Sequence, residues 1–136
     1  MIYCPTSPVD IISKYYAKDS DIYYILWIHS EQVKDKAIEI ATKHPELKAD
    51  LRFLEEAAML HDIGIFLCNA HGIHCRGEHH YIEHGYLGAE ILRGEGLPDH
   101  ALVCERHTGT GLSREMIQKQ KLPLPDRDMQ PVSIEE

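Results

Sequence analysis

Apolar side chains recur at intervals of three and four residues through most of the chain, which is the spacing of amphipathic helices. The stripe Ile25, Ile28, Val33, Ala37, Ile40 and Ala41 predicts a helix that begins near Asp21 and ends near His44, before Pro45. A second stripe, Leu51, Leu54, Ala57, Ala58 and His61, predicts a helix that begins near Pro45 or Asp50 and breaks at Gly64.

Shorter helices are predicted on both sides of these two. Ser7 and Pro8 suit the N-cap and first position of a helix that runs to about Ala17. Three more are expected over about 80–93, 98–107 and 114–119, separated by glycines. Residues 66–79 and 121–131 show no clear period and are predicted loops. Strand signals are nearly absent, so the fold class is all-α. We expect an irregular bundle of five or more helices in a single domain, 1–136, with its core over about 20–136.

The last four residues, Ser133–Glu136, match the capping-box pattern Ser-x-x-Glu, which marks the start of a helix. One interpretation is a C-terminal helix that is truncated here. The other is a polar, frayed tail.

The charge of the chain limits its partners. The formal net charge is −8 at pH 7, and Lys and Arg do not cluster. Affinity for nucleic-acid polymers depends on basic patches, so a long DNA or RNA partner is disfavoured. A small phosphorylated substrate stays compatible, because bound dications neutralise it locally. The sequence does not indicate an oligomeric state.

No apolar run approaches the roughly 20 residues that span a bilayer, and we expect no membrane partner. The N-terminus has no basic leader region and no cleavage site, so we expect a cytoplasmic protein. The cysteines Cys4, Cys68, Cys75 and Cys104 form no Cys-x-x-Cys pair. They are expected to be reduced thiols, with a disulfide as the less favoured interpretation.

Ten histidines are unusual for this length, and most lie between His61 and His107. His61 follows the apolar run 57–60 and should face inward, where it needs a hydrogen-bond or metal partner. His29 likewise follows an apolar run, although a core histidine bonded to a carbonyl is commoner in general. Imidazole and the adjacent Asp62 carboxylate together suit Fe, Mn, Zn, Ni or Co. The dipeptide His61-Asp62 alone is a weak signal.

The signal for a metal site is strengthened by four spaced motifs: His29, His61-Asp62-Ile63-Gly64, His84-Gly85 and His107-Thr108-Gly109. In this order they resemble the HD-domain superfamily of metal-dependent phosphohydrolases, in particular its small, single-domain HDIG type. The similarity covers about residues 20–136, most of the chain.

The resemblance implies a five-helix core and a divalent metal centre of one or two ions. The first ion would be held by His29, His61 and Asp62. A second would add His84 and His107, with Asp62 as the catalytic residue bridging both. Fe, Mn, Zn, Ni or Co fit this ligand set, and Mg²⁺ is also compatible.

The sequence departs from the family pattern in two places. A further Asp ligand is expected on a downstream helix, yet Asp126 and Asp128 lie in a Pro-rich stretch and do not match it. Many two-metal relatives of the HD-GYP type carry Lys after His-Asp-Ile-Gly, where this chain has Ile65. Arg106 is then a candidate contact to substrate phosphate, or a solvated surface residue. The Gly109–Gly111 turn offers backbone N–H groups to an oxyanion, or simply stops a helix.

Further histidines surround the motif set. His71, His74 and Cys75, with His79 and His80, suggest a separate structural zinc site. The favoured interpretation is that His79 or His80 lines the mouth of the main site and contacts substrate or orients a ligand.

The sequence therefore predicts hydrolysis of a small phosphoester or a nucleotide or dinucleotide phosphate by a metal-activated water. Two alternatives stay open. One is a non-catalytic metal- or ligand-binding module. The other is an oxygenase with a di-iron site on a similar helical scaffold.

Overall fold

The computed structural model describes residues 2–108 and 111–136 and is helical almost throughout. Its elements are α1 (Pro8–Ile12), α2 (Asp21–Lys43), η1 (Pro45–Leu47), α3 (Leu51–Leu60), η2 (Ile63–Leu67), β1 (Asn69–Ala70), η3 (His71–Ile73), β2 (Cys75–Arg76), η4 (Tyr81–Glu83), α4 (His84–Gly94), α5 (Pro98–Arg106) and α6 (Arg114–Gln120), where η marks a 3₁₀ helix. The all-α fold class is confirmed.

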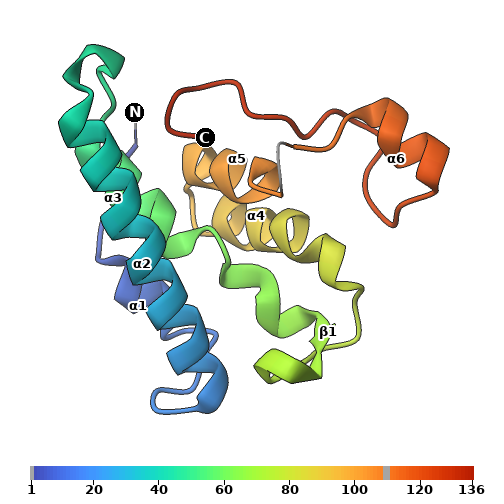
Figure 1. Ribbon diagram of the computed structural model, residues 1–136. Coiled ribbons are helices and arrows are strands. Elements are labelled where there is room, and N and C mark those ends of the chain that lie inside the picture. The colour runs from blue at the N-terminus through green and yellow to red at the C-terminus, as the bar shows by residue number, and fades with distance from the viewer. Residues whose placement is uncertain (1, 109–110) are drawn as a thin grey trace.

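Two helix pairs form the body of the protein. The long helix α2 packs along α3, and α4 packs along α5 (Figure 1). The 3₁₀ helix η2 packs against α4 and connects the two pairs, while α3 also contacts α5. Helix α3 therefore lies where the two helix pairs meet.

Close backbone packing joins η2 to α4. A Cβ placed on Gly64 would lie 2.2 Å from the carbonyl oxygen of His84 and 2.6 Å from the Gly88 nitrogen. A Cβ on Gly85 would lie 2.7 Å from the Cys104 carbonyl oxygen of α5. Real Cβ atoms do not approach backbone this closely, so glycines at these positions set the separation of the three segments.

The segment between η2 and η4 is more ordered than the sequence predicts. The expected loop 66–79 contains the end of η2, the two-residue antiparallel pair β1–β2 and the 3₁₀ helix η3. An isolated bridge between Cys68 and His79 closes its base. These pairings are tertiary and leave no local periodicity in the sequence, which explains why they were not predicted.

The helix ends also differ from the prediction. The first helix stops at Ile12 rather than Ala17, because the chain tightens into turns that bury Tyr16. The hydroxyl of Tyr16 donates a 2.6 Å hydrogen bond to the carbonyl of Ile63. The helix α3 ends at Leu60, with His61 as its C-cap, before the predicted break at Gly64.

The tail 131–136 is described and forms no helix. The Glu136 amide donates a 3.4 Å hydrogen bond to the Ser133 hydroxyl, which is one of the contacts of the predicted capping box. Glu136 also accepts hydrogen bonds from the guanidinium of Arg106, so the tail returns to α5 (Figure 1).

One buried carboxylate ties the N-terminus to the core. Glu56 on α3 accepts a 2.7 Å hydrogen bond from the Cys4 amide and lies 2.9 Å from Nε2 of His100 on α5. Arg52 adds a contact from the surface side. The N-terminal segment, α3 and α5 therefore share one polar centre.

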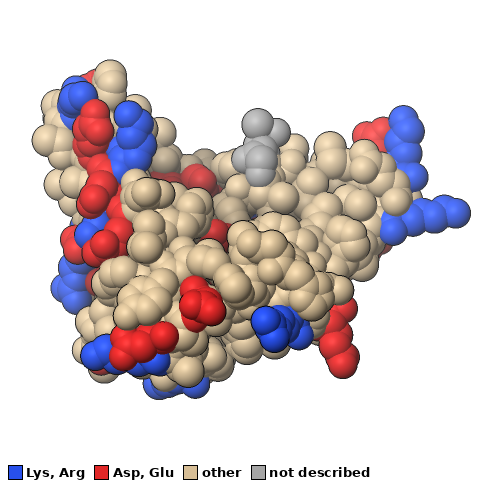
Figure 2. Space-filling view, turned by 60° about the horizontal axis from the view of Figure 1, so that its bottom comes forward, with Lys and Arg blue, Asp and Glu red and all other residues tan. Residues whose placement is uncertain are grey.

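The surface carries both signs of charge. On the face shown in Figure 2, Lys and Arg side chains lie among Asp and Glu near the edges, and the middle has few charged groups. Among the described helices, none combines the length and the hydropathy that a membrane crossing requires.

Candidate metal centre

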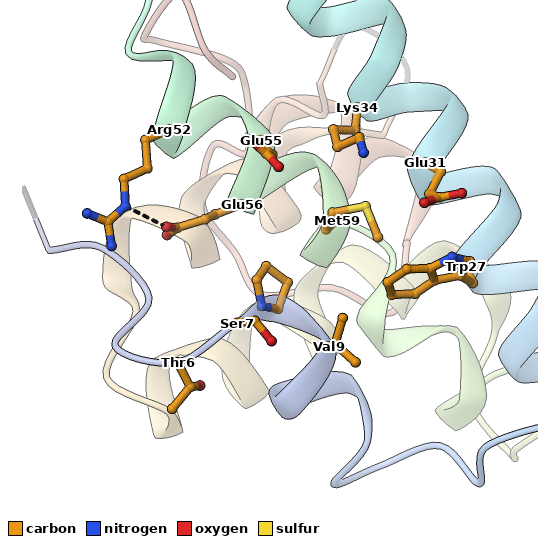
Figure 3. A pocket seen from close by; sticks show the side chains of 11 residues that line it. Thr6, Ser7, Val9, Trp27, Glu31, Lys34, Arg52, Glu55, Glu56 and Met59 are labelled. Carbon is orange, nitrogen blue, oxygen red and sulfur yellow. Dashed lines mark hydrogen bonds and ion pairs between the residues drawn. The ribbon is translucent and has the colours of Figure 1, made fainter.

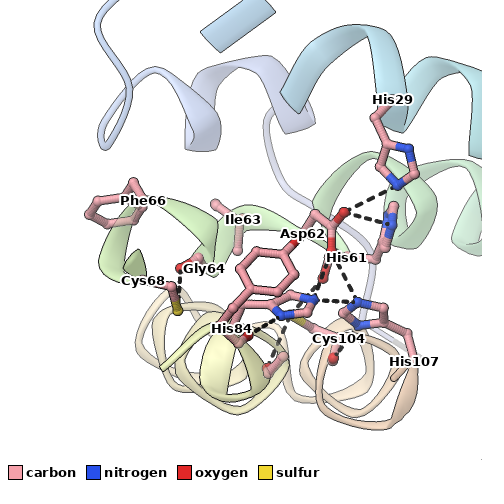
Figure 4. Close-up of polar contacts among 12 residues, drawn as sticks. His29, His61, Asp62, Ile63, Gly64, Phe66, Cys68, His84, Cys104 and His107 are labelled. Atoms are coloured by element: carbon pink, nitrogen blue, oxygen red, sulfur yellow. Dashed lines mark hydrogen bonds and ion pairs between the residues drawn. The ribbon is translucent and has the colours of Figure 1, made fainter. Parts of the chain in front are cut away.

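Four histidines from four parts of the chain converge on Asp62. His29 projects from α2, His61 caps α3, His84 begins α4 and His107 caps α5 (Figure 4). Asp62 follows directly after His61 and lies between these elements. The five residues that the sequence singled out as metal ligands are therefore brought to one place. Asp62, His61 and His84 are buried, while His29 is exposed.

The two carboxylate oxygens of Asp62 face different pairs of histidines. Oδ2 lies 3.2 Å from Nε2 of His29 and 3.4 Å from Nε2 of His61. Oδ1 lies 3.3 Å from Nε2 of His84 and 3.0 Å from Nε2 of His107. Two groups of potential ligands result, His29–His61–Asp62 and Asp62–His84–His107, and within each group the ligand atoms lie within 4.8 Å of one another. Asp62 belongs to both.

Backbone carbonyls fix the orientation of three of the rings. Nδ1 of His61 contacts the Ala58 carbonyl, Nδ1 of His84 the Tyr81 carbonyl, and Nδ1 of His107 the Cys104 carbonyl, each at 2.6 Å. A carbonyl oxygen only accepts, so each Nδ1 carries the hydrogen. In its neutral form each ring then presents an unprotonated Nε2 toward Asp62, which is the arrangement that metal-ligating histidines adopt.

These contacts test whether the residues fit a cation. Nε2 of His84 and Nε2 of His107 lie 3.0 Å apart. Because both rings already donate through Nδ1, the contact joins two lone pairs and is repulsive unless a cation, a proton or a metal ion, lies between them. Oδ1 of Asp62 is buried and receives no hydrogen bond of acceptable geometry, although His107 lies at hydrogen-bond distance.

The distances also agree with coordination. Two ligands each about 2.1 Å from one ion lie roughly 3.0 Å apart at a right angle and roughly 3.4 Å apart at the tetrahedral angle. The four contacts between imidazole nitrogen and Asp62 oxygen, from 3.0 to 3.4 Å, cover this range. The His and Asp side chains are thus positioned for a divalent metal, and they fit such an ion in both groups.

Electrostatics keep the Asp62 carboxyl of the His61-Asp62 dyad ionised. Burial alone would raise the pKa of the Asp62 carboxyl, but its interactions with the imidazoles of His107, His61 and His84 outweigh burial and hold this pKa well below its usual range. For His61, burial lowers the pKa, and the neighbouring Asp62 more than compensates and raises it. The site therefore retains a carboxylate that attracts cations.

An apolar cavity opens beside the dyad. Its volume is about 240 Å³, and its lining combines His29 and Asp62 with five side chains of largely apolar character: Ile25, Leu26, Ile65, Ile73 and Tyr81. Burial raises the pKa of Tyr81 to about 12, so the phenol is neutral in this wall. The Tyr81 ring stacks on the His84 ring at 4.4 Å between centroids.

A second cavity, of about 360 Å³, lies between α1, α2 and α3 (Figure 3). Trp27 and Met59 form part of its wall, and Arg52 and Glu56 meet at one side. The dyad takes no part in it. Of these two cavities, the smaller one is the one that Asp62 lines.

The other residues singled out by sequence lie around the centre rather than in it. Nδ1 of His79 lies 3.5 Å from a carboxylate oxygen of Glu83, and His80 accepts a hydrogen bond from the Ile82 amide. Arg106 pairs with Glu136, its Nη1 2.8 Å from the carboxylate. None of these three lines the dyad cavity. The predicted contacts of His79, His80 and Arg106 to substrate stay predictions.

The separate zinc site is not formed by the described residues. Cys75 is buried, whereas His71 and His74 are exposed, and neither belongs to a group of potential metal ligands. Of the predicted oxyanion turn, Gly109 and Thr110 lie outside the described residues. Asp126 and Asp128 both bind Arg114 of α6, as expected for residues that do not match the downstream family ligand.

Sequence reasoning did not single out Tyr81, Ile73 and Cys104. Tyr81 had a usable signal, because it precedes His84 by three residues and its carbonyl orients that ring. Cys104 donates through Sγ to the His61 carbonyl at 3.0 Å and the Gly85 carbonyl at 3.3 Å, so it links the two halves of the centre. Ile73 reaches the cavity through tertiary pairing alone.

A family model for the HD domain matches residues 26–131 of this chain. The chain belongs to the HD-domain family. The match spans the dyad and the three other histidines around Asp62. The predicted family is therefore confirmed, and with it membership in a superfamily of metal-dependent phosphohydrolases.

Several relatives share this HD domain. An uncharacterized protein of Methanocaldococcus jannaschii is 36% identical over 111 residues, which cover 79% of this chain and 58% of the relative. A protein named tRNA (cytidine(56)-2'-O)-methyltransferase from Thermoplasma volcanium is 35% identical over 94% of this chain and 32% of its own length. Its namesake from Picrophilus torridus is 37% identical over 79% and 27%. The HD-domain chain thus spans between about a quarter and three-fifths of these relatives. No solved structure matches.

Proposed function

We propose that this HD domain is a metal-dependent phosphohydrolase that acts on a small phosphoester, including a nucleotide or dinucleotide phosphate. The observation that carries the proposal is Asp62, whose two oxygens each face a separate pair of imidazole nitrogens. One carboxylate placed between two ligand groups suits two ions that share it as a bridge.

The residues divide into two sets in this proposal. His29 and His61 would hold one ion, His84 and His107 the other, and Asp62 both. A divalent ion, when bound, would lower the pKa of a water ligand, to about 7 in the case of Zn²⁺, and would polarise a phosphoryl oxygen. The chain's own part is orientation: carbonyls of Ala58, Tyr81 and Cys104 lock three rings with Nε2 facing inward. Fe, Mn, Zn, Ni, Co and Mg are the candidates for the ion.

Apolar side chains limit the access of water to one side of the site. The cavity beside the dyad is lined mainly by apolar side chains, which shield a bound phosphate from bulk solvent on that side. The electrostatic attraction between a metal centre and a phosphate is stronger where water is excluded.

The test is turnover of bis(p-nitrophenyl) phosphate and p-nitrophenyl phosphate by protein reconstituted with each candidate metal. We expect at least one metal to support hydrolysis, and Asp62→Ala to lose both bound metal and turnover. His29→Ala is expected to weaken metal binding, and its matched control is His44→Ala, because His44 caps the same helix α2 and its side chain contacts Glu46. Equal metal content in wild type and Asp62→Ala would sink the assignment.

Two other functions are separated by the same measurements. A non-catalytic metal- or ligand-binding module would bind metal tightly and turn over neither ester. A di-iron oxygenase would consume oxygen with iron bound and would be inactive with Zn²⁺. The dyad geometry alone is shared by all three, so activity decides between them.

The names of two relatives raise a nucleic-acid partner as a further possibility to exclude. Both are named as tRNA methyltransferases, and this chain spans about a third or less of each. We propose that the chain itself binds no nucleic-acid polymer, because its net charge is −8 and it has no cluster of Lys and Arg. Filter binding with unmodified tRNA at low salt tests this, and retention of tRNA would contradict it.

A further inference from the structure

The cavity beside the dyad combines two kinds of surface. One side is the charged centre, represented by His29 and Asp62, and the rest is formed by aliphatic side chains and one phenol ring. Among the described residues that line it, none is Lys, Arg or Glu. A phosphate in this cavity would therefore meet no side-chain cation, and the remainder of its ligand would meet apolar atoms.

The apolar wall is accessible rather than sealed core. Ile25 on α2 and Ile73 on η3 are half-buried, and Tyr81 on η4 is 37% exposed. Ile65 on η2 and Leu26 on α2 form the buried floor. Four separate elements thus present apolar surface to one space of about 240 Å³. Removing such surface from water is favourable in proportion to the area covered.

The wall is held in place by the fold. Gly77 packs closely against Leu67, since a Cβ on Gly77 would lie 2.2 Å from the Leu67 carbonyl oxygen. This contact holds the β1–β2 pair against the end of η2. Ile73 lies in η3 between these two strands. Tyr81 is fixed by its carbonyl contact to His84 and by stacking of the two rings. The apolar surface therefore exists before any ligand binds.

We propose that this cavity is a specificity subsite that selects phosphate esters whose organic part is a compact apolar or aromatic group. The phosphate lies at the metal centre, and the organic group lies against Ile25, Ile73 and Tyr81. Esters of polyols are disfavoured, because their hydroxyls lose water on entry and find few polar partners. This inference rests on the proposed function for the position of the phosphate, and extends it to the class of substrate.

The test uses two stable phosphonates with one head group, benzylphosphonate and methylphosphonate, bound to the metal-loaded protein and measured by calorimetry. Wild type is expected to bind benzylphosphonate about tenfold or more tighter, which corresponds to burial of most of the ring. Ile73→Ser is expected to reduce this ratio several-fold without changing methylphosphonate affinity. Ile40→Ser, the same change at an exposed position of α2 that does not line the cavity, is the control that leaves the ratio unchanged.

The outcomes separate the two proposals. No metal-dependent binding of methylphosphonate would contradict the proposed function. Normal methylphosphonate binding with an equal affinity for benzylphosphonate would overturn the subsite alone. Because Ile73 is half-buried in a short segment, a melting curve accompanies the variant. If Ile73→Ser unfolds, Ile25→Ser on the long helix α2 is measured in its place, with the same expected loss of ratio.

Discussion

Gly64 of η2 and Gly88 of α4 touch backbone to backbone, with no side chain between them. A Cβ on Gly64 would lie 2.9 Å from the Cα of Gly88, and one on Gly88 would lie 3.0 Å from the Gly64 nitrogen. This contact fixes the distance between Asp62, just before η2, and His84, at the start of α4. The glycine of His-Asp-Ile-Gly thereby constrains the geometry of the centre, although it supplies no ligand atom.

Gly64→Ala is therefore expected to destabilise the protein and weaken metal binding together. The added methyl meets the His84 carbonyl, and α4 has to move to admit it, at a cost of about 1–3 kcal/mol. Chemical denaturation and metal titration measure the two effects. Gly94→Ala, at the open end of α4, has nothing within 4 Å and should leave both unchanged. Normal metal affinity in folded Gly64→Ala would show that the contact does not set the site.

Glu56→Ala is expected to be among the most destabilising single changes outside the metal centre. It leaves the Cys4 amide and the buried His100 ring without their acceptor. Each buried donor left without an acceptor typically costs about 1–3 kcal/mol. The free energy of unfolding from urea titration measures it. Glu55→Ala, at the neighbouring exposed position, serves as control and should change stability by less than about 0.5 kcal/mol.

The thiols are expected to resist alkylation in the folded protein. All four cysteines are free and buried. Burial raises the pKa of Cys68 to about 11 and that of Cys104 well above its usual value, so few thiolates exist at pH 8. Iodoacetamide labelling followed by mass spectrometry should show little modification at pH 8, and four adducts in denaturant. Rapid labelling of native protein would contradict the buried assignment.

The raised pKa of the Cys68 thiol makes the free energy of unfolding depend on pH. A thiol whose pKa is higher in the folded state stabilises the fold fully below its unfolded pKa, and this contribution disappears as pH rises through the folded value. For Cys68 the window runs from 9.0 to about 11. The melting temperature of metal-free protein should therefore fall across this range. A melting temperature that stays constant or rises would contradict the shift.

Bound metal is expected to raise the melting temperature in a concentration-dependent way. A ligand that binds only the folded state stabilises it by about 2.7 kcal/mol at one hundred times its dissociation constant. Thermal scans with increasing Mn²⁺ or Zn²⁺ measure the shift in wild type and in Asp62→Ala. The variant should show none. A similar shift in both would place the metal elsewhere.

Much of this centre was predictable because its ligands stand at the ends of predicted helices. His61 and His107 lie near the predicted ends of their helices, which glycines mark, and His84 lies in the first turns of the predicted helix 80–93. The cavity wall was not predictable in the same way. Ile73 lies in a segment without periodicity, and its place depends on pairing between Cys68 and His79. The early end of α1 likewise follows from a long-range bond, Tyr16 to Ile63, that no local rule contains.

The hydrogen bonds from the imidazole rings of His61 and His107 to backbone carbonyls affect how an ion binds. His61 and His107 terminate α3 and α5, and each satisfies a last-turn carbonyl that has no amide partner within its helix. These two ligands are thus ordered by helix termination before an ion binds. Little conformational entropy is lost on binding, so loading should be a rapid second-order event rather than coupled folding, and the empty protein should keep its shape.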